Sequence, residues 1–295
     1  MSIETVAVIS PGDMGHVVAR VIRDKGLRVI TSLSGRSKLS CARASRSGME
    51  DVGSLRAVLR EADAVLSIMP PEFAFSFAEA IASEPFENDT PVFADCNAVS
   101  PATTDKMRQL CEGSGVEFVK IGIIGPPPGG GDAETRFYAS GPAVDSLSFL
   151  DGGGINYKSL GTDCSKAAAI KMCYAALTKG TMTMHTAVLT AAELLGVSES
   201  FHHELAGSQV FHWDLMNKRV PFYAADAGRW AGEMDEISET FLNTGVTGNL
   251  HKGAADVFRM LDTTSLAEET RETADKSRTL DEAISIYAET VKRGK

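Results

Sequence analysis

A glycine turn near the N-terminus has the residue types and the spacing of an anion-binding site. The turn reads Ser10-Pro11-Gly12-Asp13-Met14-Gly15 and lies between an apolar run at 5–10 and a helical pattern that ends near Gly26. Such a turn leaves unpaired backbone N–H groups at the start of the helix, where the helix dipole favours an anion such as a diphosphate. Serine stands where the G-x-G-x-x-G motif of dinucleotide sites has its first glycine. We predict that Ser10, Gly12, Asp13, Met14 and Gly15 form a nucleotide-binding turn, with a purely structural turn as the alternative.

The segment Ser34-Gly35-Arg36-Ser37-Lys38 follows the second apolar run, at 28–33. In dinucleotide sites a carboxylate at this place binds the ribose hydroxyls, whereas an arginine neutralises a 2′-phosphate. The segment has no carboxylate, but its two hydroxyls and its guanidinium could bind a phosphate through charge-assisted hydrogen bonds. We therefore predict NADPH as the cofactor, with Ser34, Arg36 and Ser37 among the residues that bind it. A solvated surface loop is the alternative.

Apolar runs and helical patterns alternate through the first half of the chain. The runs lie at 5–10, 28–33, 64–69, 91–95 and 116–121. This alternation predicts an α/β fold, with an N-terminal Rossmann domain and a doubly wound parallel sheet over residues 1–161. Strand signals then fade, and we predict an all-α C-terminal domain over residues 162–295. The stretch 166–195 has no proline and one glycine, which predicts one continuous helix of about 45 Å that could connect the domains.

Composition excludes several classes of protein. The chain has 295 residues, and its 29 Lys+Arg against 39 Asp+Glu give a net charge of −10, which disfavours nucleic acid as a partner. We find no membrane-spanning run, no secretion signal and no HExxH metal motif. The five cysteines are scattered and never in a CxxC spacing, which is typical of buried thiols in a reducing compartment. We expect a cytoplasmic protein without a structural metal.

The order of several motifs along the chain resembles the β-hydroxyacid dehydrogenase superfamily, which includes 6-phosphogluconate dehydrogenase and the imine reductases. The closest likeness is to the branch with the small phosphogluconate-dehydrogenase-like helical C-terminal domain. The resemblance covers nearly the whole chain. It is carried by Gly12-x-Met14-Gly15, the Met69-Pro70 loop, Asp95-x-Asn97-Ala98-x-x-Pro101, the Gly125 loop and a helix bearing Lys171.

The resemblance implies an NADPH-dependent oxidoreductase that acts on CH–OH groups. Such an enzyme transfers a hydride between the nicotinamide and a small hydroxyacid or carbonyl substrate. The Met69-Pro70 loop would lie at the cofactor, and the family typically dimerises through its helical domains, so we expect a homodimer. The direction of the reaction stays open.

The resemblance also gives Lys171 the role of general acid and base. Hydride delivery needs such a group in any case, because negative charge builds on the substrate oxygen. Tyr174 lies on the same face of the helix as Lys171, and Lys179 lies about 80° around it. We expect both Tyr174 and Lys179 to bind substrate. The alternative for the two lysines is that they reach from an alanine-rich helix into solvent.

The chain departs from the family pattern around the substrate. Tyr174 and Ala175 replace amides, and the loop at Gly125 lacks the usual serine. Gly125 and Asn97 are predicted to contact substrate, although Asn97 could instead hydrogen-bond the nicotinamide carboxamide or cap a turn. Two other functions stay open. One is an imine reductase, in which the substrate nitrogen arrives already protonated, and the other is a non-catalytic NADPH-binding sensor.

Overall fold

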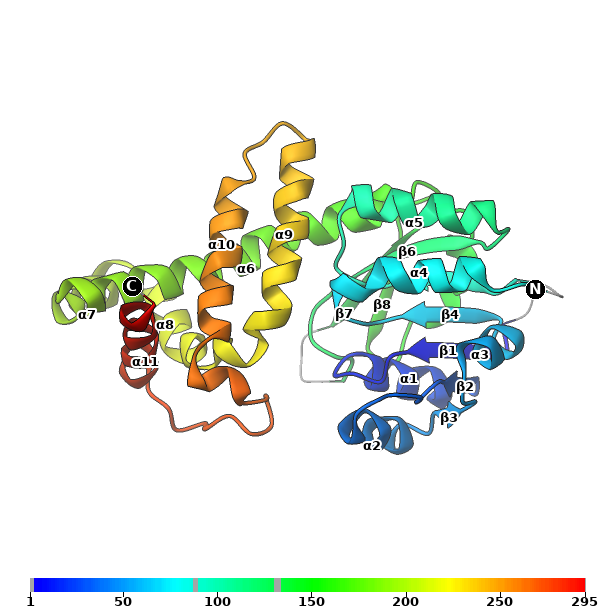
Figure 1. The fold of residues 1–295 in the computed structure, drawn as a ribbon, viewed down its shortest axis with the longest axis horizontal. Coiled ribbons are helices and arrows are strands. Elements are labelled where there is room, and N and C mark those ends of the chain that lie inside the picture. The colour runs from blue at the N-terminus through cyan, green and yellow to red at the C-terminus, as the bar shows by residue number, and fades with distance from the viewer. Residues whose placement is uncertain (1–2, 87–89, 130–133, 295) are drawn as a thin grey trace. The chain divides into compact units, whose positions relative to one another are not determined.

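The computed structural model describes residues 3–86, 90–129 and 134–294. The chain forms two compact units, Met1–Met172 and Cys173–Lys295 (Figure 1). The division falls inside helix α6 (Ser165–Leu195), which is continuous, as its lack of proline predicts. The sequence places the domain boundary just before this helix.

An eight-stranded sheet is the framework of the first unit (Figure 1). Its strands are β1 (Thr5–Ile9), β2 (Arg28–Thr31), β3 (Glu50–Asp51), β4 (Ala64–Ser67), β5 (Val92–Asp95), β6 (Phe118–Ile124), β7 (Thr135–Ser140) and β8 (Ile155–Ser159). The order across the sheet is β3-β2-β1-β4-β5-β6-β7-β8. All neighbouring strands are parallel except β6 and β7, which are antiparallel. The predicted Rossmann fold with a doubly wound parallel sheet is confirmed, and β1, β2, β4, β5 and β6 lie at the predicted runs.

Alternate side chains of each strand enter two separate hydrophobic layers, because the pleat sends successive residues to opposite faces. In β1, Val6 and Val8 pack in the layer that includes helix α1 (Gly15–Asp24), whereas Ala7 and Ile9 pack in the layer that includes helices α4 (Ala74–Ser83) and α5 (Pro101–Gly113). Helices on both faces bury β4, β5 and β6 completely, which is why these strands are apolar runs. The helices are α1 (Gly15–Asp24), α2 (Lys38–Arg46), α3 (Leu55–Glu61), α4 (Ala74–Ser83) and α5 (Pro101–Gly113).

Strands β7 and β8 were not predicted, and neither was β3, which has only two residues. β7 runs antiparallel to β6, and β8 pairs parallel to β7. The chain direction of β7 and β8 is therefore opposite to that of the other strands of the sheet. Their sequences, TRFYAS and INYKS, mix polar and aromatic residues. Such strands are stabilised by pairing with a neighbour more than by an apolar pattern of their own, so hydropathy alone does not find them.

The second unit is helical, as predicted. Beyond α6 its helices are α7 (Ser198–Ser208), α8 (Val210–Arg219), α9 (Ala227–Asn243), α10 (Asn249–Asp262) and α11 (Leu280–Arg293). Helices α9 and α10 pack side by side (Figure 1). The Trp230 and Phe258 rings lie 5.3 Å apart between their centroids, and Tyr287 of α11 is fully buried and donates a hydrogen bond to the Val220 carbonyl at 2.9 Å. Phe258 and Tyr287 belong to the buried core of the unit.

The five cysteines are free thiols. Cys96, Cys111 and Cys164 are buried, as expected, but Cys173 is exposed and Cys41 is half-buried. The scattered spacing predicts the lack of disulfides but not the exposure of single thiols, which depends on helix packing. In the described part of the chain, no helix is both long enough and apolar enough to cross a membrane.

Candidate cofactor and active site

The glycine turn follows β1 and leads directly into α1. Its first bond is from the Gly12 N–H to the Ser10 carbonyl, at 2.9 Å. A Cβ on Gly15 would stand 2.0 Å from the Ser10 carbonyl oxygen, so only glycine lets α1 start this close to β1. A Cβ on Gly12 would meet no atom within 4 Å. Gly15 is therefore required by packing, whereas the space beside Gly12 is open to a ligand.

The start of α1 has the features of an anion site. Met14 precedes the helix without a side-chain cap, and within the described residues the N–H groups of Asp13, Met14 and Gly15 make no backbone hydrogen bond. These donors and the helix dipole favour a negative group. The Asp13 carboxylate opposes this preference, but it forms an ion pair with Arg43 of α2. The residues of the turn fit a diphosphate.

The segment after β2 holds an exposed guanidinium. Arg36 is exposed, and among the described residues its side chain has no partner that the structure records. Ser34 is exposed beside it, and Gly35 takes a positive φ of 71° that turns the chain toward α2. Ser37 caps α2, because its hydroxyl accepts a hydrogen bond from the Ser40 N–H at 3.2 Å. A phosphate here would meet both the Arg36 charge and the N-terminus of a helix.

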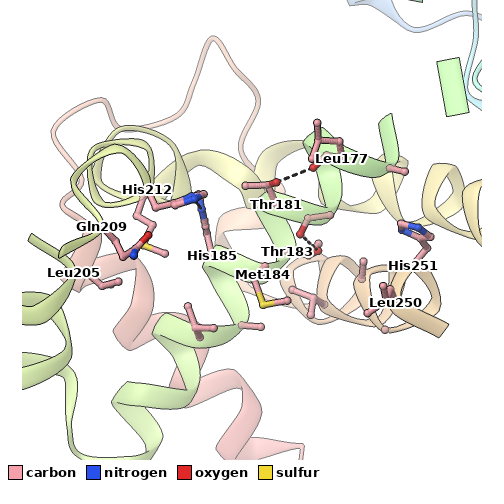
Figure 2. Close-up of a pocket in the computed structure, with 18 of the residues that line it drawn as sticks. Leu177, Thr181, Thr183, Met184, His185, Leu205, Gln209, His212, Leu250 and His251 are labelled. Atoms are coloured by element: carbon pink, nitrogen blue, oxygen red, sulfur yellow. Dashed lines mark hydrogen bonds between the residues drawn. The ribbon is translucent and has the colours of Figure 1, made fainter. Parts of the chain in front are cut away.

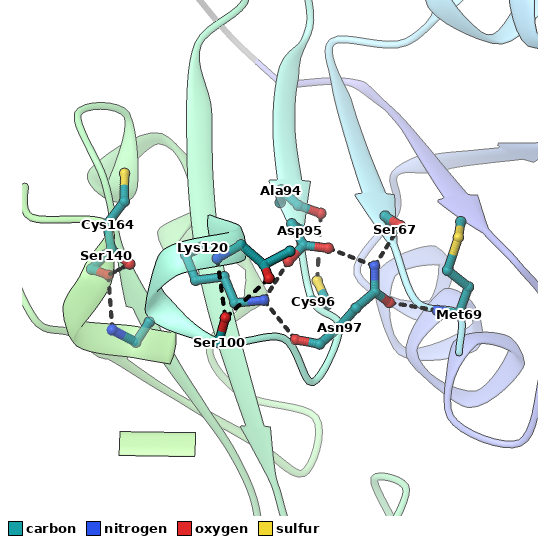
Figure 3. Close-up of polar contacts among 12 residues, drawn as sticks. Ser67, Met69, Ala94, Asp95, Cys96, Asn97, Ser100, Lys120, Ser140 and Cys164 are labelled. Atoms are coloured by element: carbon teal, nitrogen blue, oxygen red, sulfur yellow. Dashed lines mark hydrogen bonds and ion pairs between the residues drawn. The ribbon is translucent and has the colours of Figure 1, made fainter. Parts of the chain in front are cut away.

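The loop after β4 is tied to both of its neighbours. The Ser10 N–H donates to the Ile68 carbonyl at 3.1 Å, which joins the glycine turn to the Met69-Pro70 loop. On the other side, the Met69 N–H donates to Asn97 Oδ1 at 2.6 Å (Figure 3). The turn, the loop and Asn97 thus lie together at the carboxyl ends of β1, β4 and β5. Ligands of open α/β sheets bind at this edge, where the strand order reverses between β1 and β4.

Asn97 is 3% exposed, and its whole side chain is engaged. Besides accepting from Met69, it donates from Nδ2 to Ser67 Oγ at 2.9 Å and to Asp95 Oδ1 at 2.5 Å. This arrangement is the turn-holding role that the sequence left open for Asn97. Beside it, burial first and then Asp95 raise the pKa of the Cys96 thiol, which therefore stays protonated.

Lys171 is anchored at the end of β6. Its ammonium donates a hydrogen bond to the Ile123 carbonyl at 2.8 Å, and the side chain is half-buried. Helix α6 can come this close because β6 has a glycine opposite it. A Cβ on Gly122 would lie 2.5 Å from the Ala167 carbonyl oxygen and 3.0 Å from Lys171 Cβ. Gly122 thus sets the position of Lys171.

Gly125 ends this strand in a conformation that only glycine adopts readily. Its φ is 118°, and a Cβ would stand 2.6 Å from the Glu134 carbonyl oxygen. The residue is exposed, so its backbone faces solvent at the same edge of the sheet as Ile123.

The two other predicted substrate residues belong to the helical unit. Tyr174 is 44% exposed, and its carbonyl accepts a hydrogen bond from the Thr178 hydroxyl at 3.1 Å. Lys179 is 9% exposed and forms an ion pair with Glu233 of α9, with 2.5 Å between Nζ and Oε2. Lys179 therefore does not extend into solvent, which the alternative for this lysine required.

The first unit brings most of the predicted site residues to one edge of the sheet. Sequence reasoning missed three contributors: Arg43, which pairs with Asp13; Gly122, which admits α6; and Lys120, which is buried beside Asn97. A glycine opposite an alanine-rich helix is a signal for close packing, but nothing in the sequence indicates which helix it faces. Among the described residues, no cluster of three or more His, Cys, Asp or Glu side chains could hold a metal ion.

Two family models match parts of the chain. Residues 1–110 match the acetohydroxy acid isomeroreductase NADPH-binding domain, and residues 192–261 match a domain of unknown function, DUF1932. The first match covers the glycine turn, Arg36, the Met69-Pro70 loop and Asn97. It confirms the predicted cofactor class, NADPH.

Solved structures match nearly the whole chain. A conserved protein of unknown function, described as similar to 3-hydroxyacid dehydrogenases, is 27% identical, with 87% of this chain and 96% of that chain covered and a TM-score of 0.63. A Mycobacterium tuberculosis 3-hydroxyisobutyrate dehydrogenase with L-serine is 17% identical over 97% and 99% of the two chains, at a TM-score of 0.63. The chain resembles the 3-hydroxyacid dehydrogenases in fold. The predicted resemblance is confirmed at this level.

An imine reductase from Streptomyces aurantiacus shares the architecture less closely. It is 18% identical over 95% of this chain and 98% of its own, at a TM-score of 0.51. These likenesses agree with the predicted class, an NADP-dependent oxidoreductase of hydroxyacid or carbonyl compounds, ahead of the imine reductase alternative. The placement beside 6-phosphogluconate dehydrogenase stays a prediction.

Proposed function

We propose that this protein is an NADPH-dependent oxidoreductase that interconverts a small hydroxyacid and its carbonyl form, with Lys171 as general acid and base. The observation that carries the proposal is the 2.8 Å hydrogen bond from Lys171 Nζ to the Ile123 carbonyl. It holds an ammonium at the carboxyl end of β6, on the sheet edge that also carries the glycine turn and the Met69-Pro70 loop.

The cofactor would be bound by groups of the first unit. The N–H groups at Asp13, Met14 and Gly15 would bind the diphosphate, and Arg36 with Ser34 and the N-terminus of α2 would bind the 2′-phosphate. Bound NADPH supplies a hydride for carbonyl reduction, and NADP⁺ accepts one in the reverse direction. The Met69-Pro70 loop would orient the nicotinamide end, because it is tied to the glycine turn through Ile68 and Ser10.

Lys171 would donate a proton to the substrate oxygen in reduction and accept one from it in oxidation. In reduction, Nζ stabilises the negative charge that develops on the substrate oxygen and then donates a proton to it. In oxidation, the neutral amine accepts that proton from the substrate hydroxyl. The Ile123 carbonyl helps because it holds the amine in place before substrate binds. The Lys171 side chain then loses less conformational entropy on binding.

Substrate contacts would come from Gly125 and Tyr174, which are exposed, and from Asn97 and Lys179. For Asn97 the proposal requires a contact in addition to its three existing hydrogen bonds. For Lys179 it requires Glu233 to exchange partners, since the two side chains form an ion pair. An anionic substrate group could take the place of the carboxylate.

The test replaces Lys171 with alanine. We expect Lys171→Ala to lower kcat by about 10² or more while leaving the Kd for NADPH within about twofold of the wild type. Lys166→Ala is the control, because Lys166 is an exposed lysine on the same helix. Substrates are found by following NADPH absorbance with panels of hydroxyacids, aldehydes and imines. Unchanged turnover in Lys171→Ala would remove the proposed acid.

The two alternatives make different predictions in the same assay. An imine reductase turns over cyclic imines faster than carbonyl compounds and depends less on Lys171. A sensor binds NADPH but oxidises none of it with any panel substrate. The match of residues 1–110 to an NADPH-binding domain is compatible with both alternatives, so turnover decides.

We also propose a homodimer formed by the helical units. The second unit has an apolar pocket of about 700 Å³ between α6, α7, α8 and α10 (Figure 2). Leu177, Met184 and Leu250 line it while remaining 71%, 58% and 70% exposed. Monomers rarely expose a contiguous apolar patch of this kind, and a second copy of the chain would cover it.

The oligomer proposal is tested with Met184→Glu, which places a charge on this surface. We expect light scattering with size exclusion to give a dimer for the wild type and a monomer for the variant. Phe73→Glu is the control, because Phe73 is exposed at 54% on the first unit. For location, the free thiols favour a reducing compartment such as the cytoplasm, which fractionation of the source cells would check.

A further inference from the structure

A row of polar side chains crosses the interior of the sheet. Ser67 of β4 is in register with Asp95 of β5, which is in register with Lys120 of β6, which is in register with Ser140 of β7. Figure 3 labels these four residues. All four are 0% exposed. Side chains in register on neighbouring strands point to the same face, and here that face is the layer that α4 and α5 cover. None of the four is among the site residues predicted from the sequence.

The centre of the row is a buried ion pair. Lys120 Nζ contacts the Asp95 carboxylate, and it also donates a hydrogen bond to the Asn97 carbonyl at 2.6 Å. The other oxygen of the carboxylate, Asp95 Oδ1, accepts from Asn97 Nδ2 at 2.5 Å. The pair therefore binds Asn97 at two points, once through its backbone and once through its side chain.

One end of the row reaches the loop after β4. Asn97 Nδ2 donates to Ser67 Oγ at 2.9 Å, and Asn97 Oδ1 accepts from the Met69 N–H at 2.6 Å. Both polar atoms of the Asn97 side chain thus make hydrogen bonds that hold β4, β5 and the backbone of Met69 together. A small rotation of Asn97 would move the start of the Met69-Pro70 loop.

The other end of the row reaches the helix that bears Lys171. Ser140 Oγ accepts from the Ala167 N–H at 3.0 Å and donates to the Cys164 carbonyl at 3.1 Å. These bonds hold the first turn of α6, and Lys171 lies one turn further along the helix. The polar row therefore ends at the Met69-Pro70 loop on one side and at the helix of Lys171 on the other. The proposed reaction needs both of them in place.

Stability alone does not account for the ion pair. Taking two charges out of water costs much of what their attraction returns, so buried ion pairs contribute little net stability compared with apolar residues of similar size. Lys120 is fully buried, so it cannot touch a substrate or a cofactor. What the pair does provide is a unique orientation for Asn97 in the middle of an otherwise apolar layer.

We propose that Lys120 and Asp95 are positioning residues: their buried ion pair orients Asn97 and, through it, the Met69-Pro70 loop against the bound NADPH. This inference rests on the proposed function, because it takes the loop to be part of the cofactor site. It adds two residues, neither of them exposed, that determine cofactor affinity without contacting the cofactor.

The test neutralises the pair without leaving a charge buried alone. The double variant Asp95→Asn/Lys120→Met keeps an amide oxygen that can accept from Asn97, so it should be more stable than Lys120→Met, which strands the Asp95 charge. We expect the double variant to raise the Kd and KM for NADPH about tenfold or more, since misplacement of a positioned group by about 1 Å has effects of this size or larger. Its kcat at saturating NADPH should fall by a smaller factor.

A matched control separates positioning from general loss of stability. Met107 of α5 is fully buried in the same layer but outside the polar row, so Met107→Ala lowers the melting temperature without touching Asn97. We expect Met107→Ala to leave the Kd for NADPH within about twofold of the wild type when all proteins are assayed well below their melting temperatures. If the ion-pair variants fail to fold, Ser67→Ala removes one partner of Asn97, and a Kd raised by about threefold or more is then expected.

Each outcome decides between the two proposals. If the wild type binds NADPH and turns over substrate but the double variant binds NADPH as tightly, the positioning role is wrong and the proposed function stands. The positioning role is also wrong if Met107→Ala weakens NADPH binding as much as the double variant. If the wild type does not bind NADPH, both proposals are wrong.

Discussion

Arg43 of α2 forms an ion pair with Asp13 of the glycine turn. The Arg43 side chain is 11% exposed and Asp13 is 44% exposed, so the pair lies at the surface of the turn where the diphosphate is proposed to bind. A lone carboxylate at the start of α1 would repel that diphosphate. The arginine removes the repulsion by placing a positive charge beside it.

We expect Arg43→Ala to raise the Kd for NADPH about tenfold, which is about 1.4 kcal/mol. Fluorescence titration at low and high salt measures this, and salt should reduce the difference because it screens charges near the surface. Adding Asp13→Asn to Arg43→Ala should restore most of the affinity. If the double variant binds as weakly as Arg43→Ala, then Arg43 acts on the cofactor directly and not through Asp13.

Arg36 should discriminate between the two nicotinamide cofactors. We expect Arg36→Ala to raise the Kd for NADPH about tenfold or more and to leave the Kd for NADH unchanged, because only NADPH carries the 2′-phosphate. Arg46→Ala is the control, since Arg46 is an exposed arginine at the far end of α2, the helix that follows Arg36 in the chain. Equal losses for both cofactors would refute the phosphate assignment.

Replacing the two glycines of the turn should have different effects, one on stability and the other on NADPH affinity. Gly15→Ala puts a Cβ 2.0 Å from a backbone oxygen, so it should cost about 1–3 kcal/mol of unfolding free energy, as overpacked sites do. Gly12→Ala meets no atom within 4 Å, so it should melt close to the wild type yet weaken NADPH binding. Urea unfolding and NADPH titration separate the two effects. An undiminished NADPH affinity in Gly12→Ala would place the diphosphate elsewhere.

Stability should fall as pH falls through the range where free histidine titrates. Burial lowers the pKa of His185 below its usual 6.5, and His212, 2.9 Å away between ring nitrogens, lowers it further. The unfolded chain then binds a proton that the folded chain does not, so acid favours unfolding. The unfolding free energy should drop from about pH 7 downward and continue to drop until the pH reaches the folded pKa.

The variant His185→Gln checks this pH dependence. It should be less sensitive than the wild type between about pH 7 and pH 5.5, a window above the range in which most carboxylates titrate. His251, whose pKa burial also lowers, should account for part of the remaining dependence. If the unfolding free energy changes equally with pH in the wild type and in His185→Gln, then His185 does not contribute to the pH dependence.

The elements with strong local patterns could be predicted from the sequence. β1, the glycine turn and α1 appear together because apolar runs, glycines and helical periodicity are all local signals. The place of Lys171 on a helix also followed from the sequence, since the segment is long and unbroken, whereas its catalytic role stays a proposal. β7, β8 and the antiparallel step after β6 could not be predicted, because their stability comes from pairing with a neighbouring strand.

The polar contacts of the site depend on residues far apart in the chain. Asp95 and Lys120 are separated by 25 positions, and although both lie in apolar runs, no local pattern indicates that they pair with each other. Only the register of β5 and β6 brings them together and buries them. The same holds for Asp13 and Arg43, which come from different elements.

The sequence by itself determined that this chain forms a Rossmann domain followed by helices, with a glycine turn between its first strand and first helix and a lysine on a long helix. These features follow from short-range periodicity and turn chemistry. The tertiary structure alone decided that Asn97 holds the Met69-Pro70 loop, that Lys179 is paired with Glu233, and that Gly122 lets α6 approach β6. Distance and burial arise from packing between distant segments, and no local pattern encodes them.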